Sequence, residues 1–239
     1  TLDFAYTLYL LLNNDTTIER SQIKHYVAKW FVMSTLTSRY TGSPETQMDF
    51  DIKRIREKGF LPFFQEVEEA NLSDTFWNVR LVQLLETQII NSPFFNVFLA
   101  AQIYKGDNAL FCNGTKVGYL ITLIGDVHHI FPKQYLRNNG YNEKIQYNQI
   151  ANFTYLDTQV NKDISDAAPN VYFTNAIKQC EEGNARYGNI TDLNCLKTNM
   201  AENCIPEQIV DMDYSDYPDF LIARRKLMAA KIKDYYYSL

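Results

Sequence analysis

Two adjacent histidines followed by a proline most constrain what this chain can fold into. The segment Gly125-Asp126-Val127-His128-His129-Ile130-Phe131-Pro132 closes an apolar, β-like run, and the chain of 239 residues holds only three histidines. A proline has a fixed φ and no amide hydrogen, so Pro132 is well placed to open a helix. The pattern predicts a strand end that presents two imidazoles immediately before a helix.

The spacing of apolar residues changes near Lys105 and divides the chain into two expected domains. Before Lys105 the apolar residues recur at helical spacing, and Ser43-Pro44-Glu45 is typical of a helix start. After it, Asn113-Gly114 between two apolar runs predicts a β-hairpin within 109–124. We therefore expect a mainly α chain with a small α+β part, with a helical domain at 1–104 and a second domain at 105–239.

Further elements follow the histidine segment. The sequence predicts a strand over 153–156, helices over 132–136, 158–164, 169–180 and 219–237, a short helix or turn over 145–151, and no defined element in the Asn- and Gly-rich stretch 183–206. The helix over 219–237 should carry an exposed face of arginines and lysines.

Two asparagines complete a set of side chains suited to phosphodiester hydrolysis. A neutral histidine is the usual base near pH 7, and neighbouring residues on a strand point to opposite sides. We therefore predict His129 as the general base and His128 as a metal ligand. Asn152, at the start of the facing strand, would orient His129 by its side chain or backbone. Asn161, on the following helix, would offer its amide oxygen to the metal.

The ligand types favour a hard divalent cation. Mg²⁺ binds oxygen ligands and keeps several waters, so His128 and Asn161 with phosphate would suit it best, with Mn²⁺, Ni²⁺ and Zn²⁺ as alternatives. Lys133 and Lys162 are candidates for contact with the substrate phosphate. His25 lies in a helical pattern and is expected to be a partly exposed structural residue.

Net charge leaves two interpretations open for the basic residues. The chain carries a formal charge of −5, whereas nucleic-acid-binding domains are usually basic. Local clusters still occur at Lys53-Arg54-Arg56-Lys58 and at Arg224-Arg225-Lys226 with Lys231 and Lys233. Each cluster could contact phosphates or form a solvated helix face.

Targeting signals are missing from the sequence. It has no secretory signal, no apolar run of roughly 20 residues and no Cys-x-x-Cys pair. We expect a cytoplasmic protein with free thiols and no membrane partner.

Several segments resemble one protein family. The segments His128-His129-Ile130-Phe131-Pro132-Lys133, Ile150-Ala151-Asn152-Phe153-Thr154 and Asn161-Lys162 are similar to the C-terminal HNH (ββα-metal) nuclease region of GmrSD-type proteins, and so are Ser38–Glu45 and Arg224–Ala229. These are modification-dependent restriction enzymes and related phage-defence proteins of bacteria. The resemblance implies that residues 105–239 form a metal-dependent DNA endonuclease. Its DNA substrates would include modified DNA. Members of this family usually carry an N-terminal nucleotide-binding domain with an Asp-Gly-Gln-Gln-Arg-like motif. Since this sequence has no such motif, the resemblance implies that the nucleotide-binding domain lies upstream of it.

A second function class stays open. The chain could be a catalytically inactive HNH-fold module that binds DNA or mediates oligomerisation, and a homo-oligomer fits either function. A complete His128, His129, Asn152 and Asn161 set favours the enzyme, whereas the acidic composition favours the module.

Overall fold

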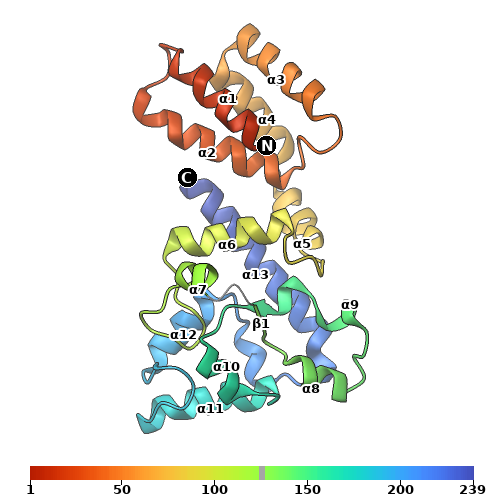
Figure 1. The fold of residues 1–239 in the computed structure, drawn as a ribbon, viewed down its shortest axis with the longest axis vertical. Helices are drawn as coiled ribbons and strands as arrows, with labels where there is room; N and C mark the ends of the chain where they lie inside the picture. Colours follow the sequence, from red (N-terminus) through yellow and green to blue (C-terminus); the bar gives the residue numbers. More distant parts are fainter. Residues whose placement is uncertain (124–126) are drawn as a thin grey trace. The chain divides into compact units, whose positions relative to one another are not determined.

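The computed structural model describes residues 1–123 and 127–239, so Gly125 and Asp126 of the histidine segment lie outside the described residues (Figure 1). Most described residues are helical, with one small antiparallel sheet, which confirms the prediction of a mainly α chain. Within these two stretches, every helix is too short or too polar to cross a lipid bilayer.

The chain divides into two compact units. Unit 1 comprises Thr1–Leu81 with Ile232–Leu239, and unit 2 comprises Val82–Lys231. The predicted domains at 1–104 and 105–239 were placed by a change in sequence pattern. Compactness is a different criterion from sequence pattern, so those domains stay a prediction.

Unit 1 is a set of helices with an aromatic core. Its elements are α1 (Leu2–Asn13), α2 (Arg20–Leu36), α3 (Pro44–Lys58), α4 (Phe60–Asn71) and a π-helical turn, η1 (Phe76–Arg80). Helix α1 packs on α2, and α3 packs on α4 (Figure 1). The buried Trp30 ring lies 5.6 Å from that of Phe4 and 5.7 Å from that of Phe63. Aromatic pairs at this spacing stabilise a core beyond their buried area.

A buried carboxylate ties α2 to α3. Asp51 is fully buried and accepts hydrogen bonds from Nε of Arg39 at 2.8 Å and from the hydroxyl of Tyr40 at 2.7 Å. Gln47 donates to it as well, at 2.9 Å. The Tyr40 hydroxyl in turn accepts from the indole of Trp30. The connection between the two helices is therefore held by a satisfied buried polar network.

Removing this carboxylate should destabilise the chain strongly. Asp51→Ala leaves the half-buried Arg39 without its anion, and breaking a buried ion pair typically costs about 3–5 kcal/mol. Asp49→Ala, at an exposed position on the same helix, is the matched control and should change stability by less than about 0.5 kcal/mol. Urea unfolding followed by circular dichroism measures both, and equal midpoints would contradict the assignment.

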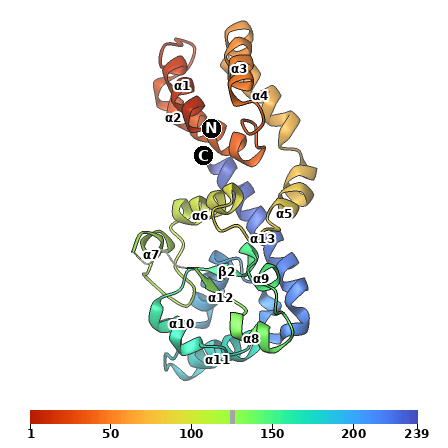
Figure 2. The same cartoon turned by 45° about the vertical axis from the view of Figure 1, so that its right-hand side comes forward.

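Unit 2 places a two-stranded antiparallel sheet among short helices (Figure 2). Its elements are α5 (Leu81–Leu84, which begins at the unit boundary), α6 (Pro93–Lys105), α7 (Val117–Leu123), β1 (His128–His129), α8 (Lys133–Asn138), α9 (Lys144–Tyr147), η2 (Ile150–Asn152), β2 (Phe153–Thr154), α10 (Thr158–Ile164), α11 (Pro169–Glu182), α12 (Leu193–Glu202), η3 (Glu207–Asp211), η4 (Tyr214–Asp216) and most of α13 (Tyr217–Ser238). In the register of the sheet, His128 pairs with Thr154 and His129 pairs with Phe153.

The helices that flank the sheet confirm the sequence predictions. Helix α8 begins directly after Pro132, and α10 spans Thr158–Ile164 as predicted. The carboxylate of Asp157 accepts the backbone N–H of Gln159 at 2.8 Å and caps α10. Helices α11 and α13 also form where expected, whereas the predicted strand at 153–156 is only two residues long.

The hairpin predicted within 109–124 is wrong. Residues Val117–Leu123 form helix α7, and the described part of the run keeps only one bridge, between Asn108 and Lys116. A Cβ on Gly118 would lie 3.4 Å from the side chain of Ile103 on α6. This close helix packing outweighs the β propensity of a Val-, Ile- and Thr-rich segment.

Asn199 of α12 takes the place of a partner strand for residues 109–112. Its buried amide accepts the backbone N–H of Phe111 at 2.8 Å and donates to the carbonyl of Ala109 at 2.9 Å and of Cys112 at 3.3 Å. Buried backbone groups need such partners when no ladder supplies them. The sequence predicted no element in 183–206, so α12 was missed.

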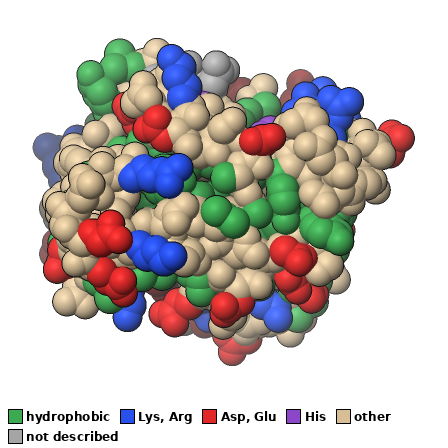
Figure 3. All heavy atoms as spheres, turned by 90° about the horizontal axis from the view of Figure 1, so that it is seen from below, with side chains coloured by type: hydrophobic (Ala, Val, Ile, Leu, Met, Phe, Trp, Pro, Cys, Tyr) green, Lys and Arg blue, Asp and Glu red, His purple; other side chains and the backbone are tan. Residues whose placement is uncertain are grey.

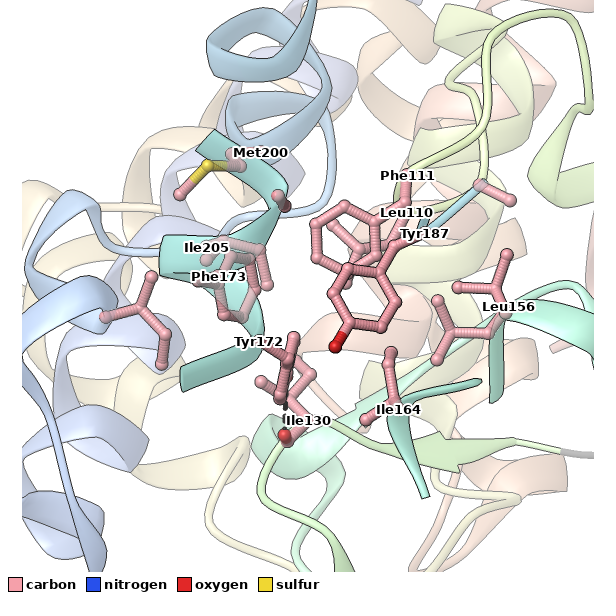
Figure 4. Close-up of a cluster of buried hydrophobic side chains, with 14 of the residues drawn as sticks. Leu110, Phe111, Ile130, Leu156, Ile164, Tyr172, Phe173, Tyr187, Met200 and Ile205 are labelled. Carbon is pink, nitrogen blue, oxygen red and sulfur yellow. Dashed lines mark hydrogen bonds between the residues drawn. The ribbon is translucent and has the colours of Figure 1, made fainter. Parts of the chain in front are cut away.

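The core of unit 2 lies against the strand that carries the histidines. Figure 4 shows Phe111, Tyr172, Phe173 and Tyr187 gathered with aliphatic side chains, all of them buried. The Tyr172 hydroxyl donates a 2.6 Å hydrogen bond to the carbonyl of Ile130, directly after β1. Burial raises the pKa of this hydroxyl, so it remains a donor at neutral pH. The core therefore holds the chain at the end of β1.

Arg224 and Arg225 do not form the exposed basic face that was predicted for α13. Arg224 is 1 % exposed, and its Nη1 donates to the carbonyls of Ala151 and Phe153 at 2.8 and 2.6 Å. Its Nη2 donates to the carbonyl of Asn203 at 3.2 Å. The reason is that backbone groups around β2 need donors and Arg224 supplies them.

The other cations of α13 are mostly paired within their own units. Arg225 is buried and lies 2.8 Å from Glu86, Lys231 pairs with the buried Asp107, and Lys233 lies 3.2 Å from Asp74. Lys226 is exposed. This part of α13 is therefore chiefly structural.

Loss of Arg224 should destabilise unit 2. Arg224→Met leaves three buried carbonyls without this donor, and each orphaned group costs about 1–3 kcal/mol, so a loss of roughly 3 kcal/mol or more is expected. The control is Lys226→Met on the exposed face of the same helix. Thermal unfolding measures both variants, and an unchanged midpoint for Arg224→Met would refute the structural role.

Candidate functional site

The two histidines lie on β1, with both side chains half-buried. The strand is held by pairing with β2 and by the backbone N–H of Ile130, which donates to the carbonyl of Asn152 at 2.8 Å. Pro132 then ends the extended segment, and α8 begins at Lys133. The predicted arrangement of a strand end with two imidazoles before a helix is therefore present.

Asn152 connects the two strand ends from inside the protein. It is fully buried, and its Oδ1 accepts the backbone N–H of Phe131 at 2.8 Å. Its Nδ2 donates to the carbonyls of Phe131 at 3.1 Å and of Tyr147 at 3.2 Å. Through these hydrogen bonds to backbone groups, the side chain fixes the turn after β1.

The His129 side chain packs against two aromatic rings and is hydrogen-bonded to Asn148, not to the predicted Asn152. Its ring meets that of Phe153 edge-on at 5.2 Å, with Tyr147 at 6.3 Å. Its Nε2 lies 2.9 Å from Oδ1 of Asn148. Burial lowers the pKa of His129, and the nearby positive charge of Lys133 lowers it further, although Asn148 acts in the opposite direction. The imidazole is therefore neutral at neutral pH, as a base must be.

A small cavity brings four of the six predicted residues together. It has a volume of about 260 Å³ and is lined by His128 and His129 of β1, Lys133 at the start of α8, and Asn161 of α10. Gln134 and Ser165 add polar groups. Ligand pockets typically measure about 300–1,000 Å³, so this one suits a phosphate group with its waters better than a whole nucleotide.

The other two predicted residues lie elsewhere. Asn152 is buried behind β1 and does not line the cavity. Lys162 is exposed on α10, next to Asn161, and is also absent from the lining. His25, expected to be partly exposed, is half-buried on α2 in unit 1.

Lys133 is held beside the cavity by an aromatic ring. Its ammonium lies 5.3 Å from the centroid of Tyr147, within the range of a cation–π contact. Tyr147 belongs to the short helix α9, which also leads to Asn148. One helix therefore positions both a cation and the hydrogen-bond partner of His129.

The donor set fits a weakly held divalent cation. Of the residues that line the cavity, His128 would supply an imidazole ligand and Asn161 an amide oxygen. Mg²⁺ needs six ligands and usually keeps several waters, so water and phosphate would have to complete the shell. Among the described residues no group of three or more His, Cys, Asp or Glu side chains is arranged to hold a metal.

Asn148 is the site residue that sequence reasoning missed. It directly follows the four-residue helix α9. Asparagine is common at such a position because of its backbone conformation alone. Nothing in its spacing relates it to His129, which is 19 residues away. Only the tertiary packing of α9 against β1 brings the two side chains together.

Charges of both signs are mixed on the face of the molecule that Figure 3 draws. Figure 3 shows lysine and arginine side chains interspersed with aspartate and glutamate on the face that it draws. This mixture agrees with the negative net charge.

Comparison with known proteins gives one distant relative. The chain is 28 % identical over 159 residues to an uncharacterized protein of the archaeon Methanocaldococcus jannaschii. The match covers 64 % of this chain. It covers only 25 % of the length of that relative. No family model matches the chain, and no solved structure matches it.

The buried amide of Asn152 should be needed for folding of unit 2. Asn152→Ala leaves the buried N–H of Phe131 without its acceptor and removes two further hydrogen bonds, so a loss of roughly 2–4 kcal/mol is expected at about 1–3 kcal/mol per unsatisfied group. Asn161→Ala, on the cavity surface, is the control and should unfold at nearly the wild-type temperature. Differential scanning calorimetry distinguishes them, and equal stability would show that Asn152 has no such role.

Proposed function

We propose that this chain is a metal-dependent DNA endonuclease of the HNH type. The observation that carries the proposal is the shared cavity of His128, His129 and Asn161, built from two antiparallel strand ends and the helix that follows the second strand. A strand–strand–helix unit with these residue types is what the ββα-metal nucleases use.

His129 acts as the general base. Its imidazole is half-buried, neutral at neutral pH and hydrogen-bonded at Nε2, which leaves Nδ1 to accept a proton. A water molecule loses its proton to Nδ1 while its oxygen attacks the phosphorus. The bond from phosphorus to the leaving oxygen breaks, and that oxygen takes up a proton from solvent.

His128 and Asn161 would hold the cation. When bound, a divalent cation supplies electrostatic stabilisation of the charge that develops on the phosphate oxygens. Mg²⁺ suits the amide oxygen best, whereas the imidazole also admits Mn²⁺, Ni²⁺ or Zn²⁺.

DNA is held through its phosphates. Lys133 lines the cavity and is the first candidate for contact with the scissile phosphate. Lys162, exposed on α10, would contact a neighbouring phosphate. Since phosphate contacts release counterions, binding should weaken as salt rises.

The biological setting belongs to the same proposal. The resemblance to GmrSD-type proteins supports a role in modification-dependent restriction or phage defence, with modified DNA among the substrates. An upstream nucleotide-binding domain would accompany the nuclease in the whole protein.

The enzyme should nick supercoiled plasmid DNA in the presence of Mg²⁺ or Mn²⁺ and stop on addition of EDTA. A positioned general base typically contributes about 10²–10⁴-fold in rate, so His129→Ala should lose activity by that factor. His128→Ala and Asn161→Ala should instead raise the metal concentration needed, with partial rescue by excess Mn²⁺. Gel-based nicking rates across a metal titration measure these effects.

His25→Ala is the matched control, because it removes a histidine outside the site, and it should cut like the wild type. If His129→Ala cuts as fast as the wild type under every metal condition, His129 is not the base. If the wild type binds DNA and never cuts it, with modified and unmodified DNA both tested, the chain is instead the inactive HNH-fold binding or oligomerisation module.

A further inference from the structure

The orientation of His129 depends on a contact that the HNH residue set does not include. Nε2 of His129 lies 2.9 Å from Oδ1 of Asn148, and both side chains are half-buried. Within 1–123 and 127–239, the His129 side chain makes no other hydrogen bond. The contact is therefore the main polar restraint on this ring.

An amide oxygen as partner selects one form of the neutral imidazole. Oδ1 of Asn148 can only accept a hydrogen bond, so Nε2 of His129 must carry the hydrogen. The lone pair then resides on Nδ1, which becomes the nitrogen that can take a proton. A base histidine needs this restraint, because the unrestrained ring exchanges between two forms of which only one is productive.

The aromatic neighbours cannot supply the same selection. Phe153 meets the ring of His129 edge-on at 5.2 Å and Tyr147 lies 6.3 Å away. These contacts restrict how the ring tilts, but they distinguish poorly between its two nitrogens. Asn148 makes that distinction.

Asn148 is itself held in place by its helix. Its backbone N–H donates to the carbonyl of Lys144 at 3.0 Å and closes α9. Asn152, the other asparagine of this region, uses its amide on Phe131 and Tyr147 instead. The side chain of Asn152 therefore binds backbone groups, whereas that of Asn148 binds the ring of His129.

We propose that Asn148 is the positioning residue that fixes His129 with its hydrogen on Nε2 and its lone pair on Nδ1. This inference rests on the proposed nuclease function of the same site. Asn148 acts through His129 and need not touch the substrate.

The first test observes the ring without any activity. The full chain labelled with ¹⁵N is measured by imidazole NMR at a pH well above 6.5, the ordinary pKa of histidine. The His129 signals are those lost in His129→Gln, and His25 serves as internal reference. The wild type should show the hydrogen on Nε2 of His129. Asn148→Ala should mix the two forms, whereas Asn148→Asp, which keeps an acceptor oxygen, should retain the wild-type form.

The second test measures turnover of DNA nicking. Loss of a residue that orients a site group typically costs about 10–100-fold, so Asn148→Ala should lower kcat by that factor with little change in KM. Asn142→Ala, at an exposed position before α9, is the matched control and should match the wild type in both measurements.

The outcomes separate this inference from the function on which it rests. A wild-type His129 with its hydrogen on Nδ1 overturns the positioning role, even if Asn148→Ala fails to fold. An active wild type with an equally active Asn148→Ala also overturns it. If no variant cuts DNA under any metal condition, the nuclease proposal fails, while the NMR result still decides whether Asn148 fixes the ring.

Discussion

A buried guanidinium supports the geometry on which the candidate site depends. Arg224 reaches from α13 to the carbonyls of Ala151 and Phe153, which flank Asn152 on both sides. Burial lowers the pKa of Arg224 to about 10, so it remains charged at neutral pH. A charged donor makes stronger hydrogen bonds than a neutral one, and here its acceptors are backbone groups beside β2.

This interaction explains how strands of only two residues can hold a site. Two-residue strands pair through very few hydrogen bonds and would be unstable alone. Arg224 fixes β2 from one side, Asn152 ties it to the turn after β1, and Tyr172 holds the carbonyl of Ile130. Buried polar side chains thus replace a ladder, and the two histidines project from a backbone that the core has already positioned.

Local signals account for the parts of the fold that could be predicted. Pro132 before α8 and Asp157 before α10 each act within one or two residues, so the sequence shows them directly. Helix α7 was not predicted, because its Val-, Ile- and Thr-rich sequence favours a strand, whereas in the fold the segment is helical and packs closely on α6 at Gly118. The exposed basic face predicted at Arg224-Arg225 was wrong because both side chains are buried. A run of charged residues does not show in the sequence whether tertiary packing will bury it.

The sequence alone determined which chemistry is available: a pair of histidines before a helix start, and an asparagine on a later helix whose bounds were predictable. Those features depend on residue type and on short-range backbone preference. Only the tertiary structure decided which side chains meet. It placed His128, His129 and Asn161 on one cavity, left Lys162 outside its lining and brought Asn148 to His129. Contacts across 19 to 73 residues of chain arise from packing, and no local pattern encodes them.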